Sequence, residues 1–464
     1  MRADLLNDTV DGLDEALAAV DGFDEVLVGG LLRPGPAQAV GLAALAEAVA
    51  GSPLAGRVAE AAGKTAAGAA GEDHFVALAA ARTALLGSVH DALLLRVEEA
   101  VGRARAEESG TAAAGGEEHA ANLCAAARSW LCDLARAGWR GIDHEVITGA
   151  APVVSAMLPD PALRRLATLL DGFAAELAAS CPGATLEHVP VRRWADLWSR
   201  AVLLTLPGAA SAPAAGEVTG RLLPLGVDVQ EHATAVQAQV HAVFEPADGG
   251  TPRLVRASVS APKPDTVVGA GLWQLLRPHL SLLAAVSEGR AMELDAMPVT
   301  GEGDLLWDDA RARTGEPAEV FATARVALPA AAAFATAPLD RHPARIAVPV
   351  LLEGYTVEED GDGVAFQVAG QRLAVDTDRV PAAGPLTPEV VASSGACVGL
   401  LRWDAGEFLL QPLAVERTVR KKSVAVHAGA WAGGTADKAG VRAEKAATDA
   451  VKVLRERAGK LLRK

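Results

Sequence analysis

The stretch that decides the fold covers residues 236–261 and reads VQAQVHAVFEPADGGTPRLVRASVSA. Over residues 236–244, apolar side chains alternate with Gln237, Gln239 and His241, which is the period of a strand with one buried face. A turn rich in Pro, Asp and Gly follows, and the alternation returns in RLVRASVSA. The stretch therefore predicts an antiparallel hairpin.

The residues before this hairpin have a helical pattern instead. An apolar stripe at helical spacing runs from Leu78 to Val97, as in an amphipathic helix. In residues 158–177, Asp160 and Pro161 stand in the order of an N-cap and a first helical residue, ahead of another apolar stripe. We therefore expect the first 205 or so residues to be helical.

A stretch of Pro, Gly and Ala over residues 207–220 separates the helical pattern from the strand pattern and marks a boundary. Beyond it we expect a helix over residues 266–289 and another that begins at Thr387. Further strand patterns occupy residues 318–328, 344–357, 363–375 and 399–415.

The expected fold class is α+β, with an N-terminal all-helical domain followed by a mixed, mainly antiparallel β domain with inserted helices and a basic C-terminal helix. The expected bounds are residues 1–206 for the helical domain, residues 221–416 for the mixed domain and residues 417–464 for the tail. A chain of 464 residues is long enough for two or three domains with cores of their own.

Composition indicates a cytoplasmic protein. The N-terminus is acidic and amphipathic rather than a basic leader with an apolar core, and no apolar run approaches the roughly 18 residues of a membrane span. The 4 cysteines form no CxxC arrangement, which fits a reducing compartment. On one helix Cys124 and Cys132 would lie about 12 Å apart, beyond the roughly 7 Å that a disulfide tolerates. They are therefore interpreted as core residues.

Charge is unevenly distributed along the chain. Residues 417–464 contain 13 Lys and Arg against 4 Asp and Glu, a net charge of +9, so residues 1–416 carry −24 of the total of −15. Such asymmetry is typical of a segment with a binding partner of its own, which could be nucleic acid, an acidic protein or the acidic body of this chain.

The tail ends in a predicted basic amphipathic helix. Its apolar stripe runs from Ala447 to Leu462, and cations occupy the remaining faces. A glycine-rich hinge over residues 432–440 precedes the helix. The candidate partner-binding residues of the tail are Arg442, Lys445, Val451, Lys452, Leu454, Arg455, Leu461 and Leu462.

Trp194 and Trp198 are a second candidate partner-binding surface. They lie four residues apart on a predicted helix, with Arg192, Arg193 and Arg200 beside them. Tryptophan and arginine are enriched at the energetic centres of protein interfaces. The alternative is a domain-joining helix with buried indoles.

No motif indicates catalysis, a metal site or a cofactor. GAWAGGTADK, residues 429–438, lacks the Lys-Ser/Thr that a phosphate loop requires after its second glycine. Asp228, His232 and His241 are scattered metal-capable side chains, whereas zinc prefers three or four grouped ligands. We therefore expect no nucleotide at this stretch and no metal.

Four stretches resemble uncharacterised actinobacterial proteins: residues 54–94, LLPLGVDVQEHATAVQAQVHAVFE (222–245), residues 374–415 and AVKVLRERAGKLLRK (450–464). The resemblance covers nearly the whole chain. It implies a genomic setting beside SWIM-type zinc-finger proteins, MoxR-type AAA+ ATPases and von Willebrand factor A domain proteins. The chain lacks the CxC…CxH, Walker and DxSxS motifs of those neighbours, so it is none of them.

These observations favour a non-catalytic adaptor or scaffold subunit of a multi-component system that contains an AAA+ ATPase. The expected partner is a protein, either an AAA+ ATPase or a SWIM zinc-finger protein, and no membrane or small molecule is indicated. A component that binds nucleic acid through the basic tail is the first alternative. An enzyme with an unrecognised site is the second.

Overall fold

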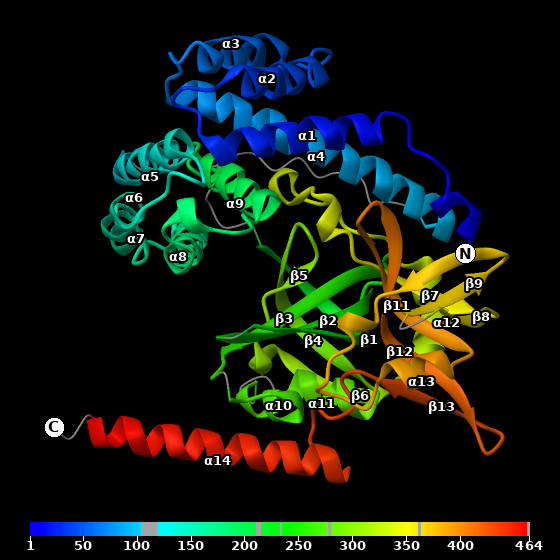
Figure 1. The fold of residues 1–464 in the computed structure, drawn as a ribbon. Coiled ribbons are helices and arrows are strands. Elements are labelled where there is room, and N and C mark those ends of the chain that lie inside the picture. The colour runs from blue at the N-terminus through cyan, green and yellow to red at the C-terminus, as the bar shows by residue number, and fades with distance from the viewer. Residues whose placement is uncertain are drawn as a thin grey trace.

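The computed structural model describes residues 1–103, 118–209, 215–232, 234–264, 266–276, 280–360 and 363–461. A helical part lies above two sheets in Figure 1. The helical part contains α1 (Leu13–Gly29), α2 (Pro36–Ala48), α3 (Ala55–Ala66), α4 (Glu72–Val101), α5 (Glu118–Ala137), α6 (His144–Thr148), α7 (Ala150–Met157), α8 (Arg164–Ala179) and α9 (Val191–Leu204).

The helical part has a hydrophobic core of its own, in which aromatic side chains meet edge to face. The ring centroid of Trp139 lies 5.8 Å from that of Trp194 and 6.2 Å from that of Phe173, and all three side chains are buried. Such pairs add about 0.5–1.5 kcal/mol each beyond the burial of their apolar area. The tryptophans therefore stabilise this part of the fold.

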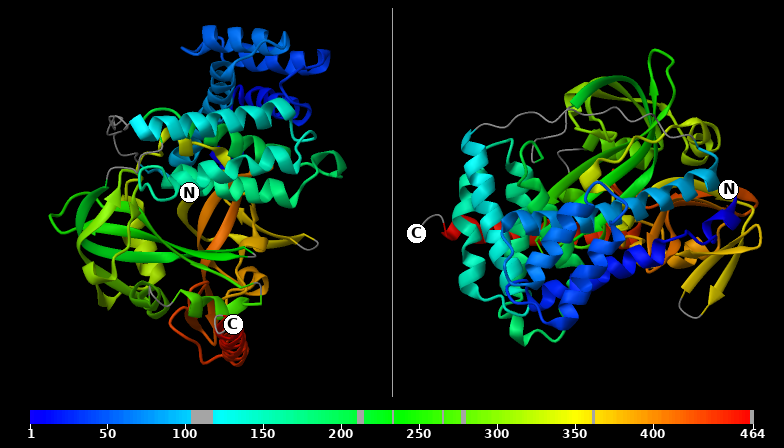
Figure 2. Two further views of the ribbon diagram at one scale, coloured as in Figure 1. Left: turned by 90° about the vertical axis from the view of Figure 1, so that its left-hand side faces the viewer. Right: turned by 90° about the horizontal axis from the view of Figure 1, so that it is seen from above.

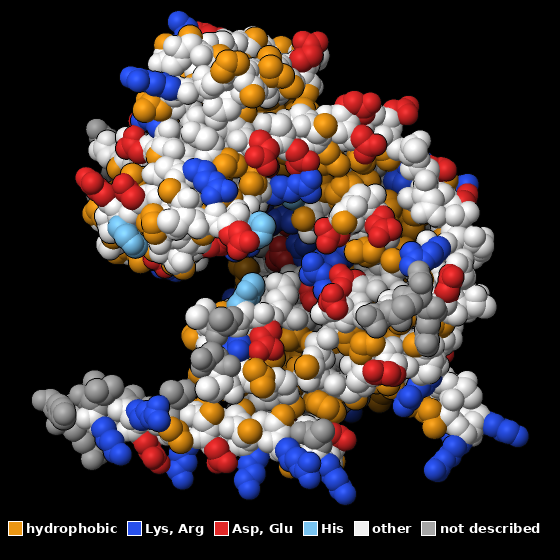
Figure 3. Space-filling model, viewed as in Figure 1, with side chains coloured by type: hydrophobic (Ala, Val, Ile, Leu, Met, Phe, Trp, Pro, Cys, Tyr) orange, Lys and Arg blue, Asp and Glu red, His pale blue; other side chains and the backbone are white. Residues whose placement is uncertain are grey.

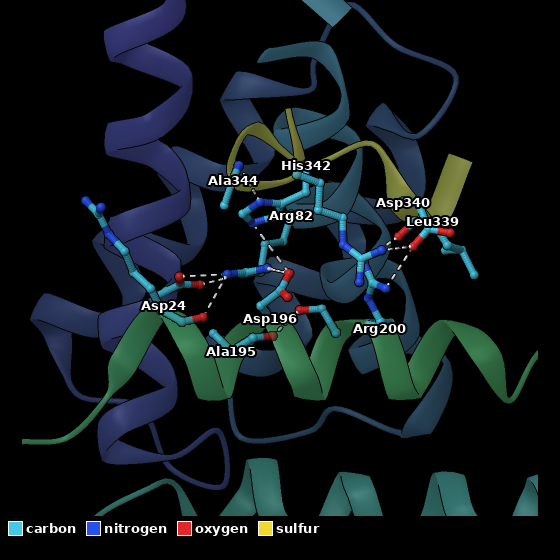
Figure 4. A network of polar contacts seen from close by, with 12 residues as sticks. Asp24, Arg82, Ala195, Asp196, Arg200, Leu339, Asp340, His342 and Ala344 are labelled. Carbon is cyan, nitrogen blue, oxygen red and sulfur yellow. Dashed lines mark hydrogen bonds and ion pairs between the residues drawn. The ribbon is translucent and has the colours of Figure 1, made fainter. Parts of the chain in front are cut away.

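A buried ion pair joins α1 to α4 within this core (Figure 4). Arg82 donates from Nε to Asp24 Oδ1 at 2.6 Å and from Nη2 to Asp24 Oδ2 at 2.9 Å, and the two side chains are only 2% and 1% exposed. Arg82 also lies 3.6 Å from Asp196 on α9. Burial raises the pKa of Asp24 to about 6 in spite of Arg82, so the carboxyl is ionised at neutral pH.

The long helix α4 belongs to both parts of the protein. Its residues from Phe75 to Leu86 pack in the helical core, whereas those from Val89 to Ala100 pack in the core of the sheets. A helix of 30 residues is about 45 Å long, so one element can span both. By length and composition α4 could cross a membrane, but most of it is buried inside the protein, as in the core helix of a globular protein.

The first sheet follows the helical part. Its strand order is β1-β2-β3-β5-β4-β6, and β4 also pairs with β1, so the strands from β1 to β5 form a closed ring of hydrogen-bonded neighbours. The ladder between β2 and β3 confirms the predicted hairpin. The bounds are β1 (Ala215–Glu231), β2 (Ala235–Pro246), β3 (Arg253–Pro262), β4 (Arg290–Thr300), β5 (Asp304–Leu305) and β6 (Ala312–Pro317), with η3 (Gly269–Gly271), α10 (Leu272–Leu275) and α11 (Leu280–Glu288) between β3 and β4.

The second sheet has the strand order β7-β11-β12-β10-β9-β8, and β13 pairs with the end of β12. Its ladders are antiparallel except that of β10 with β12. The bounds are β7 (Val348–Glu353), β8 (Thr356–Asp360), β9 (Gly363–Val368), β10 (Gln371–Val375), β11 (Ala396–Asp404), β12 (Glu407–Val419) and β13 (Lys422–His427); α12 (Val320–Val326) precedes the sheet, α13 (Pro388–Ala392) interrupts it and α14 (Lys438–Leu461) follows it.

The two sheets meet where β1 approaches β12, and a buried carboxylate joins them there. A Cβ added to Gly226 would come within 2.7 Å of the Cβ of Leu413, so the close approach requires glycine. Asp228 accepts hydrogen bonds from Gln411 Nε2 at 2.8 Å and from Arg402 Nη2 at 2.9 Å. Gly226 therefore permits the contact between the sheets, and Asp228 fixes their relative position.

The α+β fold class is confirmed, with helices first and mainly antiparallel strands after them. The strand predicted over residues 318–328 is wrong, because Phe321 and Ala324 of α12 lie in one buried cluster at helical spacing. The cap predicted at Asp160 is also displaced: its side chain accepts from the amide of Ala162 at 2.9 Å, and α8 begins only at Arg164. Strands β4 to β6 were not expected.

The polar face of the first sheet carries a buried histidine. His241 pairs with Arg256 on β3, is 1% exposed, and its Nε2 has no hydrogen-bond partner among the described residues. Burial, followed by the positive charges of Arg256 and Arg402, lowers the pKa of His241 to about 3. The imidazole is therefore neutral in the folded protein at every physiological pH.

Replacing Arg82 by Ala tests the buried ion pair. The substitution leaves Asp24 buried without its cation, and we expect the free energy of unfolding to fall by about 3–5 kcal/mol. Chemical denaturation measures this quantity. Arg192→Ala is the control, because Arg192 is 75% exposed in its pair with Asp21, and such a pair contributes about 0–1 kcal/mol. Equal losses in the two variants would contradict the interpretation.

The buried His241 predicts a pH dependence of stability. The unfolded chain protonates this side chain near its ordinary pKa of about 6.5, whereas the folded chain keeps it neutral down to about pH 3. Stability contributed by the neutral form is therefore lost as the pH falls from 6.5, by about 2 kcal/mol between pH 7 and pH 5. In urea unfolding, His241→Gln should lose less stability between pH 7 and pH 5 than the parent protein. His144→Gln, at an exposed position, should lose as much as the parent protein. An equal loss of stability in the parent protein and in both variants would contradict the prediction.

Candidate functional site

A cleft of about 1120 Å³ lies between the helical part and the sheets, in the hollow at the centre of Figure 3. Charged and amide side chains line it from α8 and α9, from the polar face of the first sheet, from the segment between the sheets and from the loop after β10. Ligand sites often occupy such interfaces between parts of a protein. Because the lining comes from distant parts of the chain, no local motif predicts this cleft.

Three arginines surround one carboxylate on the helical side of the cleft. Asp340 accepts from Arg165 Nη2 at 3.0 Å, from Arg200 Nη1 at 2.9 Å and from Arg345 Nη1 at 2.5 Å. Burial of Asp340 favours its protonated form, but the charges of Arg345, Arg200 and Arg165 outweigh burial and hold the pKa of Asp340 below its ordinary value. The carboxyl is therefore ionised, and the cluster has an excess of positive charge.

This cluster also connects the two parts of the protein. Arg165 lies on α8 and Arg200 on α9, whereas Asp340 belongs to η7 (Pro338–Asp340) in the segment between the sheets. Arg200 adds a hydrogen bond from Nη2 to the backbone oxygen of Leu339 at 2.9 Å. The cluster thus fixes the helical wall of the cleft to the sheets.

The sheet side of the cleft carries carboxyl and amide groups. Arg256 forms a bidentate pair with Asp304, at 2.9 Å from Nε and 2.8 Å from Nη2. The half-buried carboxyl of Glu302 and the amide of Gln237 make no hydrogen bond or ion pair with another described residue. Burial, followed by the negative charges of Asp340 and Asp304, raises the pKa of Glu302. The side chains of Glu302 and Gln237 both line the cleft.

The basic tail provides a second candidate site on the opposite side of the sheets. Asp437 ends the preceding turn and caps α14: its Oδ1 accepts from the amide of Gly440 at 3.0 Å, and its backbone oxygen accepts from the amide of Val441 at 2.8 Å. This is ordinary N-cap geometry. The stretch GAWAGGTADK therefore leads into a capped helix, and Asp437 has a structural role there.

The first half of α14 docks on η3 and α10. Ala447 is 3% exposed, and it lies so close to Gly271 that a Cβ added there would come within 2.4 Å of the Cβ of Ala447. Gln274 donates to the backbone oxygen of Glu444 at 2.9 Å and accepts from Thr448 Oγ1 at 2.7 Å. This half of the helix is therefore part of the folded body.

The distal half of α14, residues 452–461, extends past the body of the protein, as Figure 1 and the right-hand view of Figure 2 show. Val451 is half-buried against the core of the sheets, and among the side chains that the structure describes it is the last of the helix to pack there. Val453 is 45% exposed. The exposed cations of the helix include Arg442, Lys445, Lys452, Arg457 and Lys460. The side chains of Leu454, Arg455 and Leu461, and the whole of Leu462, lie outside the described residues, so their roles stay predictions.

The predicted hinge over residues 432–440 is shorter than expected. Ala432 is buried, and the backbone oxygen of Ala430 accepts from Ser287 Oγ at 2.8 Å. Gly434 has a φ of 107°, which only glycine adopts readily. The chain is therefore docked as far as Ala432, and the change of direction occurs around Gly434.

The tip of the β12–β13 hairpin adds cations to the side of the protein that carries α14. Val419 pairs with Lys422, so Arg420 and Lys421 form a two-residue turn with φ values of 50° and 67°. Such turns favour Asn-Gly, because left-handed φ costs other residues about 1–2 kcal/mol. Figure 3 shows the cations of this tip and of α14 along the lower side of the molecule.

The predicted surface at Trp194 and Trp198 is wrong in this structure. Both side chains are 0% exposed. Trp194 donates from Nε1 to Glu176 Oε1 at 3.0 Å, and Trp198 donates from Nε1 to the backbone oxygen of Leu131 at 2.9 Å. Their spacing on α9 reflects packing in the helical core, which leaves no indole surface for a partner.

The metal-capable residues noted in the sequence do not form a ligand group. Both carboxylate oxygens of Asp228 accept hydrogen bonds from Arg402, Gln411 and Gln230. In the described part of the chain, no group of three or more His, Cys, Asp or Glu side chains is placed to hold a metal ion. Hydrogen bonding within the protein explains the position of Asp228.

Comparisons with protein-family models, with curated proteins and with solved structures gave no match to this chain.

Proposed function

We propose that the protein is a non-catalytic adaptor that binds a protein partner through the distal half of α14. The observation that supports this proposal is the division of the helix. Its first half is anchored to the body through Ala447 and Gln274, whereas the remaining turns extend beyond the sheets and carry exposed cations (Figures 1 and 3).

The sequence of the extended turns favours helix-in-groove recognition. After Val451, the residues Leu454, Leu461 and Leu462 continue the apolar spacing, and a partner's groove would bury them. A short helix without tertiary contacts is only marginally stable in water. Binding would therefore stabilise these turns, and Lys452, Arg457 and Lys460 beside them favour a groove with an acidic rim.

The identity of the partner is proposed from the resemblance noted above. It implies a multi-component system with a MoxR-type AAA+ ATPase and a SWIM zinc-finger protein, of which we take the ATPase as the first candidate partner. The composition of the chain favours a cytoplasmic setting for this system. The adaptor role requires no cofactor bound to the chain itself.

Nucleic acid is the second candidate partner, and one observation favours it. Arg420 and Lys421 occupy left-handed turn positions without glycine, whereas the two-residue turns of the β9–β10 and β11–β12 hairpins are Ala369-Gly370 and Ala405-Gly406. Backbone strain at cations is consistent with a role in binding. Binding of this kind would weaken steeply with salt, because phosphate contacts release counterions.

A paired substitution tests the adaptor proposal. Leu454→Glu with Leu461→Glu places acidic groups in the apolar stripe, and we expect affinity for the purified AAA+ ATPase to fall by about 2 kcal/mol or more, or roughly 30-fold. Val441→Glu is the matched control, because Val441 is 45% exposed on the anchored half of the same helix. Isothermal titration calorimetry measures both.

Two results would count against the proposal. Equal affinity of the two variants and the parent protein would remove the distal half of α14 from the interface. Binding of a DNA or RNA duplex that weakens steeply with salt, and that Arg420→Ala with Lys421→Ala weakens, would support the second candidate instead.

A further inference from the structure

We propose that the cleft between the helical part and the sheets binds a small phosphorylated polyhydroxyl compound, with its phosphate at Arg165 and Arg345. This site lies apart from α14 and does not depend on the adaptor proposal. Its chemistry follows from the charge of one wall, the free donors on that wall and the polar groups opposite.

The helical wall has more positive charge than its own carboxylate neutralises. Arg165, Arg200 and Arg345 all contact Asp340, so three guanidinium charges meet one carboxylate charge. Burial, followed by the charge of Arg200, lowers the pKa of Arg345, and the opposing charges of Asp340 and, at longer range, Asp196 do not outweigh them. A phosphate monoester, whose charge at pH 7 is about −1.5 to −2, would be attracted to the positive charge that remains at these arginines.

Two of the three guanidinium groups have donors to spare. Among the described residues, Arg165 makes one hydrogen bond from Nη2 and Arg345 makes one from Nη1, both to Asp340. Their side chains are 35% and 51% exposed, against 11% for Arg200. Because Arg165 and Arg345 converge on the same carboxylate and line the cleft, they can donate together to one anion.

The opposite wall fits hydroxyl groups rather than an apolar ring. The side chains of Glu302 and Gln237 make no hydrogen bond or close ion pair with another described residue, although the charges of Arg165 and Arg256 act on Glu302 at longer range, and Asp304 adds carboxylate oxygens. Carboxylates and amides accept hydrogen bonds from hydroxyl groups. These acidic groups would repel a second phosphate facing them, so the anionic group belongs at the arginines and the hydroxyl groups opposite. The volume of about 1120 Å³ leaves ample room for a sugar phosphate.

Isothermal titration calorimetry of the full chain with ribose 5-phosphate, AMP, inorganic phosphate and ribose tests this inference. We expect saturable binding of ribose 5-phosphate, AMP or both, and at least about tenfold weaker binding of inorganic phosphate and of ribose. The first two ligands distinguish a free sugar phosphate from the phosphate of a nucleotide. Neither ligand binding at millimolar concentration, or inorganic phosphate binding equally well, would overturn the inference.

Three variants place the binding at the cleft. Arg165→Gln with Arg345→Gln should weaken binding of the preferred ligand by about tenfold or more, because two charged donors are lost. Glu302→Gln should strengthen it severalfold by removing a nearby negative charge, and it leaves the Asp340 cluster intact. Arg192→Gln, outside the cleft, should change nothing. Unchanged affinity in both the double variant and Glu302→Gln contradicts the site. If the double variant is unstable, unchanged affinity in Glu302→Gln alone contradicts it.

Discussion

The contact of Asp340 with Arg165, Arg200 and Arg345 is the constraint on which the arrangement of the molecule depends. It joins two helices of the helical part to the segment between the sheets, at distances of 2.5–3.0 Å. A partly buried carboxylate needs such partners, because the loss of hydration is otherwise uncompensated. The same charges that attach the helical part therefore leave a polar cleft beside the attachment, and α4 supports it by packing in both cores.

Charge separates the molecule into two surfaces with different chemistry. The cleft sets a wall of three arginines around one carboxylate opposite a wall with carboxyl and amide groups, whereas α14 and the β12–β13 tip collect cations on the lower side (Figure 3). In the left-hand view of Figure 2, α14 lies beneath the sheets and the helical part above them. A small ligand in the cleft and a macromolecule at the basic side could therefore bind without competing for the same surface.

Local sequence patterns predicted several elements whose formation depends on residues close together in the chain. Strand alternation gave the β2–β3 hairpin, and Thr387 caps α13 as its type suggests. Residues 318–328 form α12 instead of a strand, because a short apolar run fits either element until its neighbours are known. The helical spacing of Trp194 and Trp198 likewise fits either a buried core or an exposed interface, and the structure shows both side chains buried. The Asp340 cluster joins residues up to 180 positions apart, and no local signal identifies it.

The central claim is that α14 is anchored by its first half and is available to a partner by its second. Hydrogen–deuterium exchange along the helix tests this directly, since exchange reports local opening. In the free protein we predict protected amides from residue 442 to Val451 and rapid exchange over residues 452–460, with protection extending into this range when the proposed AAA+ ATPase partner is added. Uniform protection of residues 442–460 in the free protein would contradict the claim, because the whole helix would then already be packed against this chain.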